Sequence, residues 1–202
     1  RKKEELCNTL SWREYVAGLQ DNIGYQFKDM DLLCIALTHA SYRSPTGKTH
    51  EERNHQRMEF LGDAVLELCI SRLLYDAHPD KDEGWMTRMR SLMVREDALY
   101  RVAVAVRLGD YLRMSASEER NKGRNKPSIL SDAMEALICA IYLDGGWQNA
   151  SDFILRFVPQ AVDETAVQHT RDPKTRLQEW LQRDGSVDIR YNIASEKGQA
   201  HD

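Results

Sequence analysis

The chain has 202 residues, of which 42% are hydrophobic, and this is enough for one large or two small globular domains. Its 28 Lys and Arg residues are outnumbered by 32 Asp and Glu residues, and the net charge of −4 contrasts with the basic character usual in proteins that bind nucleic-acid phosphates. No apolar run approaches the roughly 20 residues of a membrane span, no secretory signal is visible in the first residues given, and the four cysteines are widely spaced. These features predict a soluble cytoplasmic protein with reduced thiols and no disulfide framework.

Most of the chain is predicted to be helical, because its apolar residues recur at helical spacing and no alternating strand pattern is evident before residue 170. The expected helices cover residues 12–19, 27–37, 59–75, 83–107, 128–143 and 147–157. The segment 83–107 is expected to form either one long helix or two short ones. Pro45 and Gly47 predict a loop over residues 43–54, and the pair Gly145-Gly146 predicts the end of the helix before it.

Two of the expected helices carry paired carboxylates within otherwise apolar runs. Glu59 and Asp63 are four residues apart, and Asp132 and Glu135 are three apart. Both spacings place the two acids on one face of a helix, about one turn apart. The apolar neighbours predict that both helices are largely buried, so the acids face inward or into a cleft. A buried carboxylate is costly unless it is paired or holds a metal ion.

A single acid pair at this spacing is most often a solvated helix face. Two pairs embedded in apolar runs favour a divalent-cation site instead. Oxygen ligands alone indicate magnesium or manganese rather than zinc, since the sequence has no Cys-x-x-Cys pair and no array of histidine ligands. His39 is interpreted as a hydrogen-bonded structural histidine. Four carboxylates around a divalent cation suit phosphodiester hydrolysis, in which the metal activates water and neutralises the developing phosphoryl charge.

Residues 58–66, Met-Glu-Phe-Leu-Gly-Asp-Ala-Val-Leu, resemble the hallmark motif of ribonuclease III, the family of metal-dependent endonucleases that cut double-stranded RNA. Further segments match the family in the expected order, namely residues 37–42, 83–94, 127–137 and 140–146. Five co-linear segments argue against a chance match, and the resemblance extends from about residue 10 to the end of the chain. It implies an all-α endonuclease domain over residues 1–162.

The resemblance implies that Glu59, Asp63, Asp132 and Glu135 bind magnesium, for which manganese can substitute. Asp63 and Glu135 are the expected catalytic residues of this set. The family's reaction leaves 5′-phosphate and 3′-hydroxyl ends and is carried out by a homodimer in which each subunit cuts one strand. Ribosomal and messenger RNA processing are its usual tasks. Family members commonly carry Glu where this chain has Gln56; an amide cannot ionise, so Gln56 is expected to contact RNA or support the structure rather than bind metal.

A basic segment with a glycine lies just before the helix that contains Asp132. Its cations are Arg120, Lys122, Arg124 and Lys126. A solvated surface loop is one interpretation. The position of the segment at the mouth of the acidic site, together with a similar basic loop in family members, favours contacts with RNA phosphates.

The C-terminal part of the chain is predicted to be separate from the endonuclease domain. Residues 163–171 are polar and are expected to be a linker. Residues 172–182 and 189–193 resemble the first helix and first strand of a double-stranded RNA-binding domain, an α+β module. The remaining strands and the final basic helix of that module are missing from residues 172–202. This incomplete domain is therefore expected to be weakly ordered.

Three alternatives remain at this stage. A non-catalytic, ribosomal-type relative would bind double-stranded RNA without cutting it, but such relatives lose metal acids that this chain retains. The short form of the family lacks an RNA-binding domain, and residues 172–181 argue against it. An unrelated all-helical hydrolase of small phosphates could use the same acids, although the other matching segments would then be unexplained.

Overall fold

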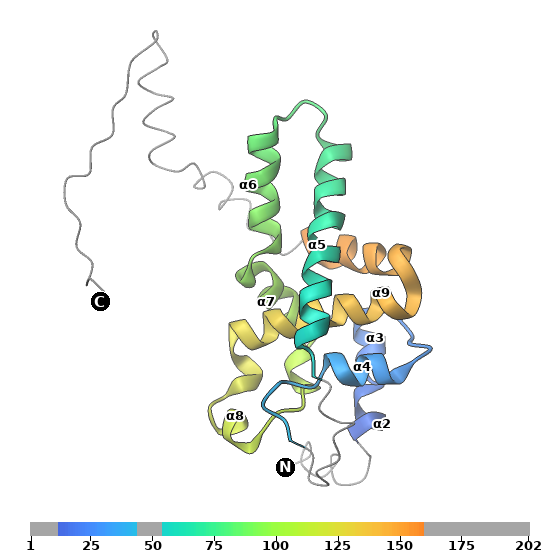
Figure 1. Ribbon diagram of the computed structural model, residues 1–202, viewed down its shortest axis with the longest axis vertical. Helices are drawn as coiled ribbons and strands as arrows, with labels where there is room; N and C mark the ends of the chain where they lie inside the picture. Colours follow the sequence, from blue (N-terminus) through green and yellow to red (C-terminus); the bar gives the residue numbers. More distant parts are fainter. Residues whose placement is uncertain (1–11, 44–53, 160–202) are drawn as a thin grey trace, which may run out of the picture. The chain divides into compact units, whose positions relative to one another are not determined.

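The computed structural model describes residues 12–43 and 54–159, and Figure 1 shows their arrangement. These residues form an all-α domain, as the sequence predicts. Within them no β-strand forms, and the only strand-like pairing is an isolated parallel bridge between Thr38 and Arg113. No helix in these two ranges is long and apolar enough to cross a membrane. The predicted loop at 43–54 falls almost wholly outside the described residues, and so do the predicted linker and RNA-binding segment.

Residues 12–43 form three short helices, α2 (Trp12–Val16), α3 (Leu19–Ile23) and α4 (Met30–Ala36). The single helix expected over residues 12–19 is therefore wrong; a turn at Gly18 separates two short helices. Helix α3 ends at Gly24, which has a left-handed backbone (φ 66°). Helix α4 is shorter than the predicted 27–37 because Asp29 caps it, its side chain accepting a hydrogen bond from the Asp31 N–H at 2.8 Å.

The central helices are α5 (Gln56–Ala77), α6 (Glu83–Val94) and α7 (Glu96–Ala105). Figure 1 shows α5 and α6 side by side as an antiparallel hairpin. The predicted segment 83–107 forms two helices because Arg95 has an extended backbone (ψ 158°) and interrupts the helical hydrogen bonding. Asp82 caps α6, since its carboxylate accepts the Trp85 N–H at 2.7 Å.

The basic segment is more ordered than the predicted loop. It begins at the last residue of a short helix, α8 (Ala116–Arg120), and includes a 3₁₀ turn, η3 (Gly123–Asn125); another 3₁₀ turn, η2 (Leu108–Asp110), precedes both. The side chain of Ser115 caps α8 by accepting the Glu118 N–H. The segment then leads into α9 (Pro127–Phe157), whose first residue is a proline.

Helix α9 is the central helix of the domain, and its first half is buried on nearly all sides by the other helices. The break predicted at Gly145-Gly146 is confirmed: Gly146 has non-helical angles (φ 76°, ψ −177°), so α9 consists of two helices joined across a kink, the second of which ends at Phe157. Asp144 anchors this kink to the segment between α3 and α4. Its carboxylate accepts hydrogen bonds from the Tyr25 hydroxyl (2.6 Å) and from the backbone N–H groups of Lys28 (3.0 Å) and Asp29 (2.8 Å).

Candidate active site

The two acidic pairs come together where α5 crosses α9. Gly62 lies at this crossing, and a Cβ atom added there would be 1.9 Å from the backbone oxygen of Glu135. Only a residue without a side chain permits such a close approach. Glu59 and Asp63 flank Gly62 on α5, so the crossing brings them beside Asp132 and Glu135 on α9.

The four carboxylates act on one another electrostatically. Burial and the negative charges of Asp63, Asp132 and Glu59 raise the pKa of Glu135 to about 8. Burial and the charges of Asp132 and Asp63 raise the pKa of Glu59. The pKa of Asp132 is also raised, by burial and then by Glu96. A carboxylate with such neighbours is held in an environment that disfavours its own negative charge.

The described residues supply no cation to balance this charge. Within residues 12–43 and 54–159, none of the four acids forms an ion pair with Lys or Arg. In the same ranges, no three His, Cys, Asp or Glu side chains are already grouped so as to hold a metal ion. The four carboxylates are near enough for three of them to act on the pKa of Glu135, but they do not form a closed ligand set. Their uncompensated charge and oxygen-only chemistry nevertheless fit a hard divalent cation such as magnesium.

Comparisons with known proteins agree with this geometry. Residues 29–161 match the family model described as ribonuclease-III-like. The chain belongs to the ribonuclease III family. It is 43% identical over 180 residues to Ribonuclease 3 of Clostridium perfringens, a match that covers 89% of this chain and 75% of that protein. It is 40% identical over 201 residues to Ribonuclease 3 of Bacillus cereus strain G9842, covering 100% of this chain and 82% of the relative.

Solved structures support the same assignment. The nuclease domain of ribonuclease III from Campylobacter jejuni superimposes on this chain with a TM-score of 0.67 at 39% identity, covering 72% of this chain and 97% of that domain. The described helices therefore form a ribonuclease III endonuclease domain, and the chain is an endoribonuclease of this family. The fold class predicted for this part of the sequence is confirmed.

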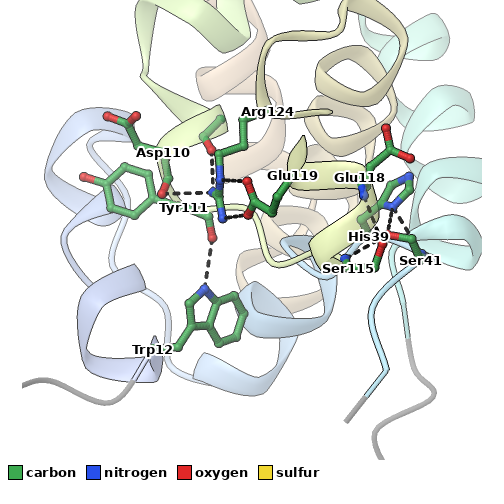
Figure 2. Close-up of polar contacts among 10 residues, drawn as sticks. Trp12, His39, Ser41, Asp110, Tyr111, Ser115, Glu118, Glu119 and Arg124 are labelled. Atoms are coloured by element: carbon green, nitrogen blue, oxygen red, sulfur yellow. Dashed lines mark hydrogen bonds and ion pairs between the residues drawn. The ribbon is translucent and has the colours of Figure 1, made fainter. Parts of the chain in front are cut away.

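Two of the predicted RNA-binding cations in this ribonuclease III domain already have intramolecular partners. Arg124 forms an ion pair with Glu119, and its Nη1 also donates to the backbone oxygen of Gly109 at 2.8 Å. Figure 2 shows this guanidinium held between the Glu119 carboxylate and the backbone next to Tyr111. Lys126 is paired with Glu118. The arrangement gives Arg124 a structural task, because it joins η2, α8 and η3.

The other two cations of the segment are exposed. Neither Arg120 nor Lys122 forms an ion pair with the described part of the chain. Lys122 has a left-handed backbone (φ 57°), which turns the chain sharply between α8 and η3. Gln56 is also exposed and is the first residue of α5, where its N–H donates to the Asn54 side chain at 3.0 Å. All three side chains are open to a ligand.

Sequence reasoning missed two neighbours of the acids. Glu96, at the start of α7, is the second cause of the raised pKa of Asp132. Its proximity depends on α7 packing against α9, which spacing along the chain does not reveal. His39, interpreted as a structural histidine, is indeed hydrogen-bonded: its Nδ1 contacts the Ser41 hydroxyl at 2.8 Å. It also lies within electrostatic range of Asp132, since each of the two shifts the pKa of the other.

Proposed function

We propose that this enzyme hydrolyses phosphodiester bonds of double-stranded RNA in a magnesium-dependent reaction at Glu59, Asp63, Asp132 and Glu135. The observation that carries the proposal is the crossing at Gly62, which gathers four carboxylates without a balancing Lys or Arg among the described residues. The names of the relatives are consistent with action on RNA. The products are expected to carry 5′-phosphate and 3′-hydroxyl ends, and precursors of ribosomal and messenger RNA are the expected substrates.

The protein's own residues have distinct tasks in this reaction. Glu135, the acid whose ionisation is most disfavoured, and Asp63, the exposed acid of α5, are the proposed catalytic ligands. Glu59 and Asp132 complete the set of oxygen ligands. A bound divalent cation would supply a nucleophile at neutral pH and stabilise the charge that develops on the phosphoryl group. Manganese, which also prefers oxygen ligands, is expected to substitute for magnesium.

Substrate binding is proposed to use the exposed polar groups around the acids. Arg120 and Lys122 are the side chains best placed to contact phosphates, because neither is neutralised by a partner in the described ranges. Lys126 can reach a phosphate only by leaving Glu118, and Arg124 only by giving up its contacts to Glu119 and Gly109. Gln56 is proposed to donate or accept hydrogen bonds from RNA at the start of α5.

The enzyme is further proposed to act as a homodimer. Phe60 and Leu68 are large apolar side chains exposed on α5, and Tyr75 is exposed near the end of the same helix. Spacings of eight and seven residues place all three on one face of the helix. An exposed apolar stripe of this kind is typical of a protein–protein contact. The printed description of the Campylobacter jejuni domain refers to a region involved in dimer formation, which is consistent with this proposal.

The decisive experiment is to incubate the purified protein with long duplex RNA in the presence and absence of magnesium. Cleavage that needs magnesium, is absent on single-stranded RNA and leaves ends that a 5′-phosphate-dependent ligase accepts would support the proposal. Binding of duplex RNA without cleavage at any magnesium or manganese concentration would instead indicate a non-catalytic RNA-binding protein.

A further inference from the structure

His39 lies where three parts of the proposed site meet. Its own backbone N–H donates to the Arg113 oxygen at 2.9 Å, which ties it to the strand-like segment that leads into α8. Its ring packs edge-on against the ring of His55, with 5.3 Å between centroids, and His55 immediately precedes α5. Its charge state is coupled to Asp132 on α9 and to Glu118 on α8. The imidazole is only half-buried at this junction.

Hydrogen bonds fix which ring nitrogen carries the proton. The backbone N–H of Ser41 donates to Nδ1 at 3.1 Å, so Nδ1 is an acceptor. The Ser41 hydroxyl also contacts Nδ1 at 2.8 Å, while its oxygen accepts the Ser115 N–H at 3.0 Å. Figure 2 shows His39, Ser41, Ser115 and Glu118 gathered in this cluster. A neutral imidazole that accepts at Nδ1 must carry its proton on Nε2.

The ring is neutral at physiological pH. Burial lowers the pKa of His39, and this effect outweighs the opposing influence of Glu118 and Asp132. Nε2–H is therefore a donor, and it has no hydrogen-bond partner among the described residues. The buried side-chain nitrogens without a partner in these residues are His55 Nδ1 and Arg113 Nε, and Nε2 of His39 is not among them. Nε2 is consequently open to an external acceptor.

We infer that Nε2–H of His39 donates a hydrogen bond to an oxygen of the RNA sugar-phosphate backbone and so positions the bound strand beside Asp132. The inference rests on the proposed function, because it takes the acidic cluster as the place of cleavage. It goes further in giving the Leu37–Tyr42 turn a direct contact with substrate. The Ser41 contacts hold the ring, and the opposite nitrogen meets the RNA. His39 is a positioning residue, since no proton transfer is required of it.

A matched pair of amide variants distinguishes a contact between Nε2 and RNA from a purely structural role of the His39 ring. In His39→Gln the terminal amide extends to the region of Nε2 and can still donate, but the Nδ1 acceptor is lost. In His39→Asn the side-chain oxygen occupies the region of Nδ1 and can still accept from Ser41, but the Nε2 donor is lost. Both variants are checked for an unchanged circular dichroism spectrum and unchanged mass by light scattering before assay.

The first measurement is duplex RNA affinity in protein that also carries Glu135→Gln, without magnesium, so that binding is followed without cleavage. His39→Asn is expected to bind roughly tenfold more weakly than the parent, as for the loss of one hydrogen bond to a charged acceptor, whereas His39→Gln should retain most of the affinity. In the otherwise unchanged enzyme, the same order is expected in kcat/KM. Any other order, including equal losses in the two variants, would overturn the inference.

The second measurement identifies the acceptor. Duplexes carrying one methylphosphonate or one 2′-deoxy substitution near the cut are bound by the parent and by the His39→Asn protein. A substitution that removes the acceptor should weaken RNA binding by the parent protein. It should not weaken binding by the His39→Asn protein any further. Coupling to the methylphosphonate assigns a phosphate oxygen, and coupling to 2′-deoxy assigns the ribose. If neither substitution is coupled to residue 39, the inference is wrong. Failure of the parent enzyme to cleave duplex RNA with magnesium would count against the proposed function alone.

Discussion

The Cα of Gly62 rests against the backbone carbonyl of Glu135, at the point where α5 and α9 cross. This contact sets the distance between the two helices and therefore the distance between their carboxylates. Glycine is required here for lack of space rather than for an unusual backbone angle, because position 62 lies in the middle of a regular helix. Gly62 has no side chain that could take part in the reaction, but its close contact with α9 brings the four acids together.

We predict that Gly62→Ala strongly destabilises the domain. The added Cβ would lie 1.9 Å from the Glu135 oxygen and 3.3 Å from the Cys139 nitrogen, both backbone atoms that cannot rotate away. The free energy of unfolding should fall by at least roughly 2 kcal/mol, as for overpacked cores. Urea unfolding followed by circular dichroism measures the change.

Gly84→Ala is the matched control. Gly84 is also helical, in α6, but the nearest atom to its added Cβ is the flexible Arg88 Nη1 at 3.3 Å. This variant should be neutral or slightly more stable, because alanine favours helix by about 1 kcal/mol over glycine. Equal stability of the two variants would mean that the close approach at Gly62 is not a constraint.

Glu135→Gln should abolish magnesium-dependent cleavage while leaving duplex RNA binding nearly unchanged. The amide preserves the shape of the side chain but removes the charge that the proposed cation needs. Cleavage and gel-shift binding are measured separately. Asp152→Asn is the control on the same helix beyond the Gly146 kink, where Asp152 is exposed and bonded to Gln148. Normal cleavage by Glu135→Gln would remove this acid from the mechanism.

Stability without divalent cations should fall as the pH rises from about 6.5 to about 8, because below pH 6.5 the lowered pKa values of His55 and His39 oppose the effect of Glu135. The folded-state pKa of Glu135 is raised from 4.5 to about 8, so in this range the folded protein holds a proton that the unfolded chain releases. The unfolding free energy therefore decreases with pH, and the raised pKa values of Glu59 and Asp132 act in the same direction. After solvent screening, the contribution of Glu135 is on the order of 1–2 kcal/mol.

Thermal unfolding in a chelator at several pH values measures this effect. Glu135→Gln has no carboxyl group to ionise at this position, so its midpoint should depend less on pH than that of the parent. Magnesium should restore the parent's stability at pH 8 but not that of the variant. An increase of the parent's midpoint between pH 6.5 and pH 8 in the chelator would contradict the electrostatic description of the site.

The two acid pairs can be found in the sequence because their signal is local. Each acid pair, Glu59 with Asp63 and Asp132 with Glu135, lies within about one helical turn. The apolar residues around each pair indicate that the helix is buried. The pair Gly145-Gly146 likewise predicts the break in α9, because the positive φ of Gly146 is a local conformation that favours glycine. The proximity of Glu96 to Asp132 depends on helix packing over long sequence separations, which one sequence does not reveal.

The basic segment shows the same limit. Its four cations look equivalent in sequence, but the fold separates them by their partners. Glu118 and Glu119 immediately precede the segment, and each neutralises one cation. Only the path of α8 and η3 decides that Arg124 and Lys126, rather than Arg120 and Lys122, meet these acids. Charge counting along the chain therefore overstates the charge that the segment offers to RNA.

Arg124→Ala and Arg120→Ala should consequently have opposite phenotypes. Loss of the Arg124 guanidinium removes its contacts to Glu119, Gly109 and Asp110, so the variant should lose roughly 1–3 kcal/mol of stability. Loss of Arg120 should leave stability unchanged but weaken duplex RNA binding. The slope of log binding constant against log salt concentration should become shallower by about one unit. Urea unfolding and salt titrations of binding are measured for both. A stable Arg124→Ala protein with reduced salt dependence would show that Arg124 binds phosphate instead.

The exposed stripe on α5 gives the last prediction, which concerns assembly. Phe60 is 82% exposed, Leu68 60% and Tyr75 69%, although each is large and apolar. Burying such side chains against a second copy would contribute about 25 cal/mol per Å² of apolar surface. Light scattering at micromolar concentration is expected to give the mass of a dimer.

Phe60→Asp combined with Leu68→Asp should give a monomer with unchanged helicity, because neither side chain supports the core of its own subunit. Val104→Asp on α7, where Val104 is 51% exposed, is the control and should remain dimeric. A monomeric parent would rule out the proposed dimer, and a dimeric double variant would move the interface away from this stripe.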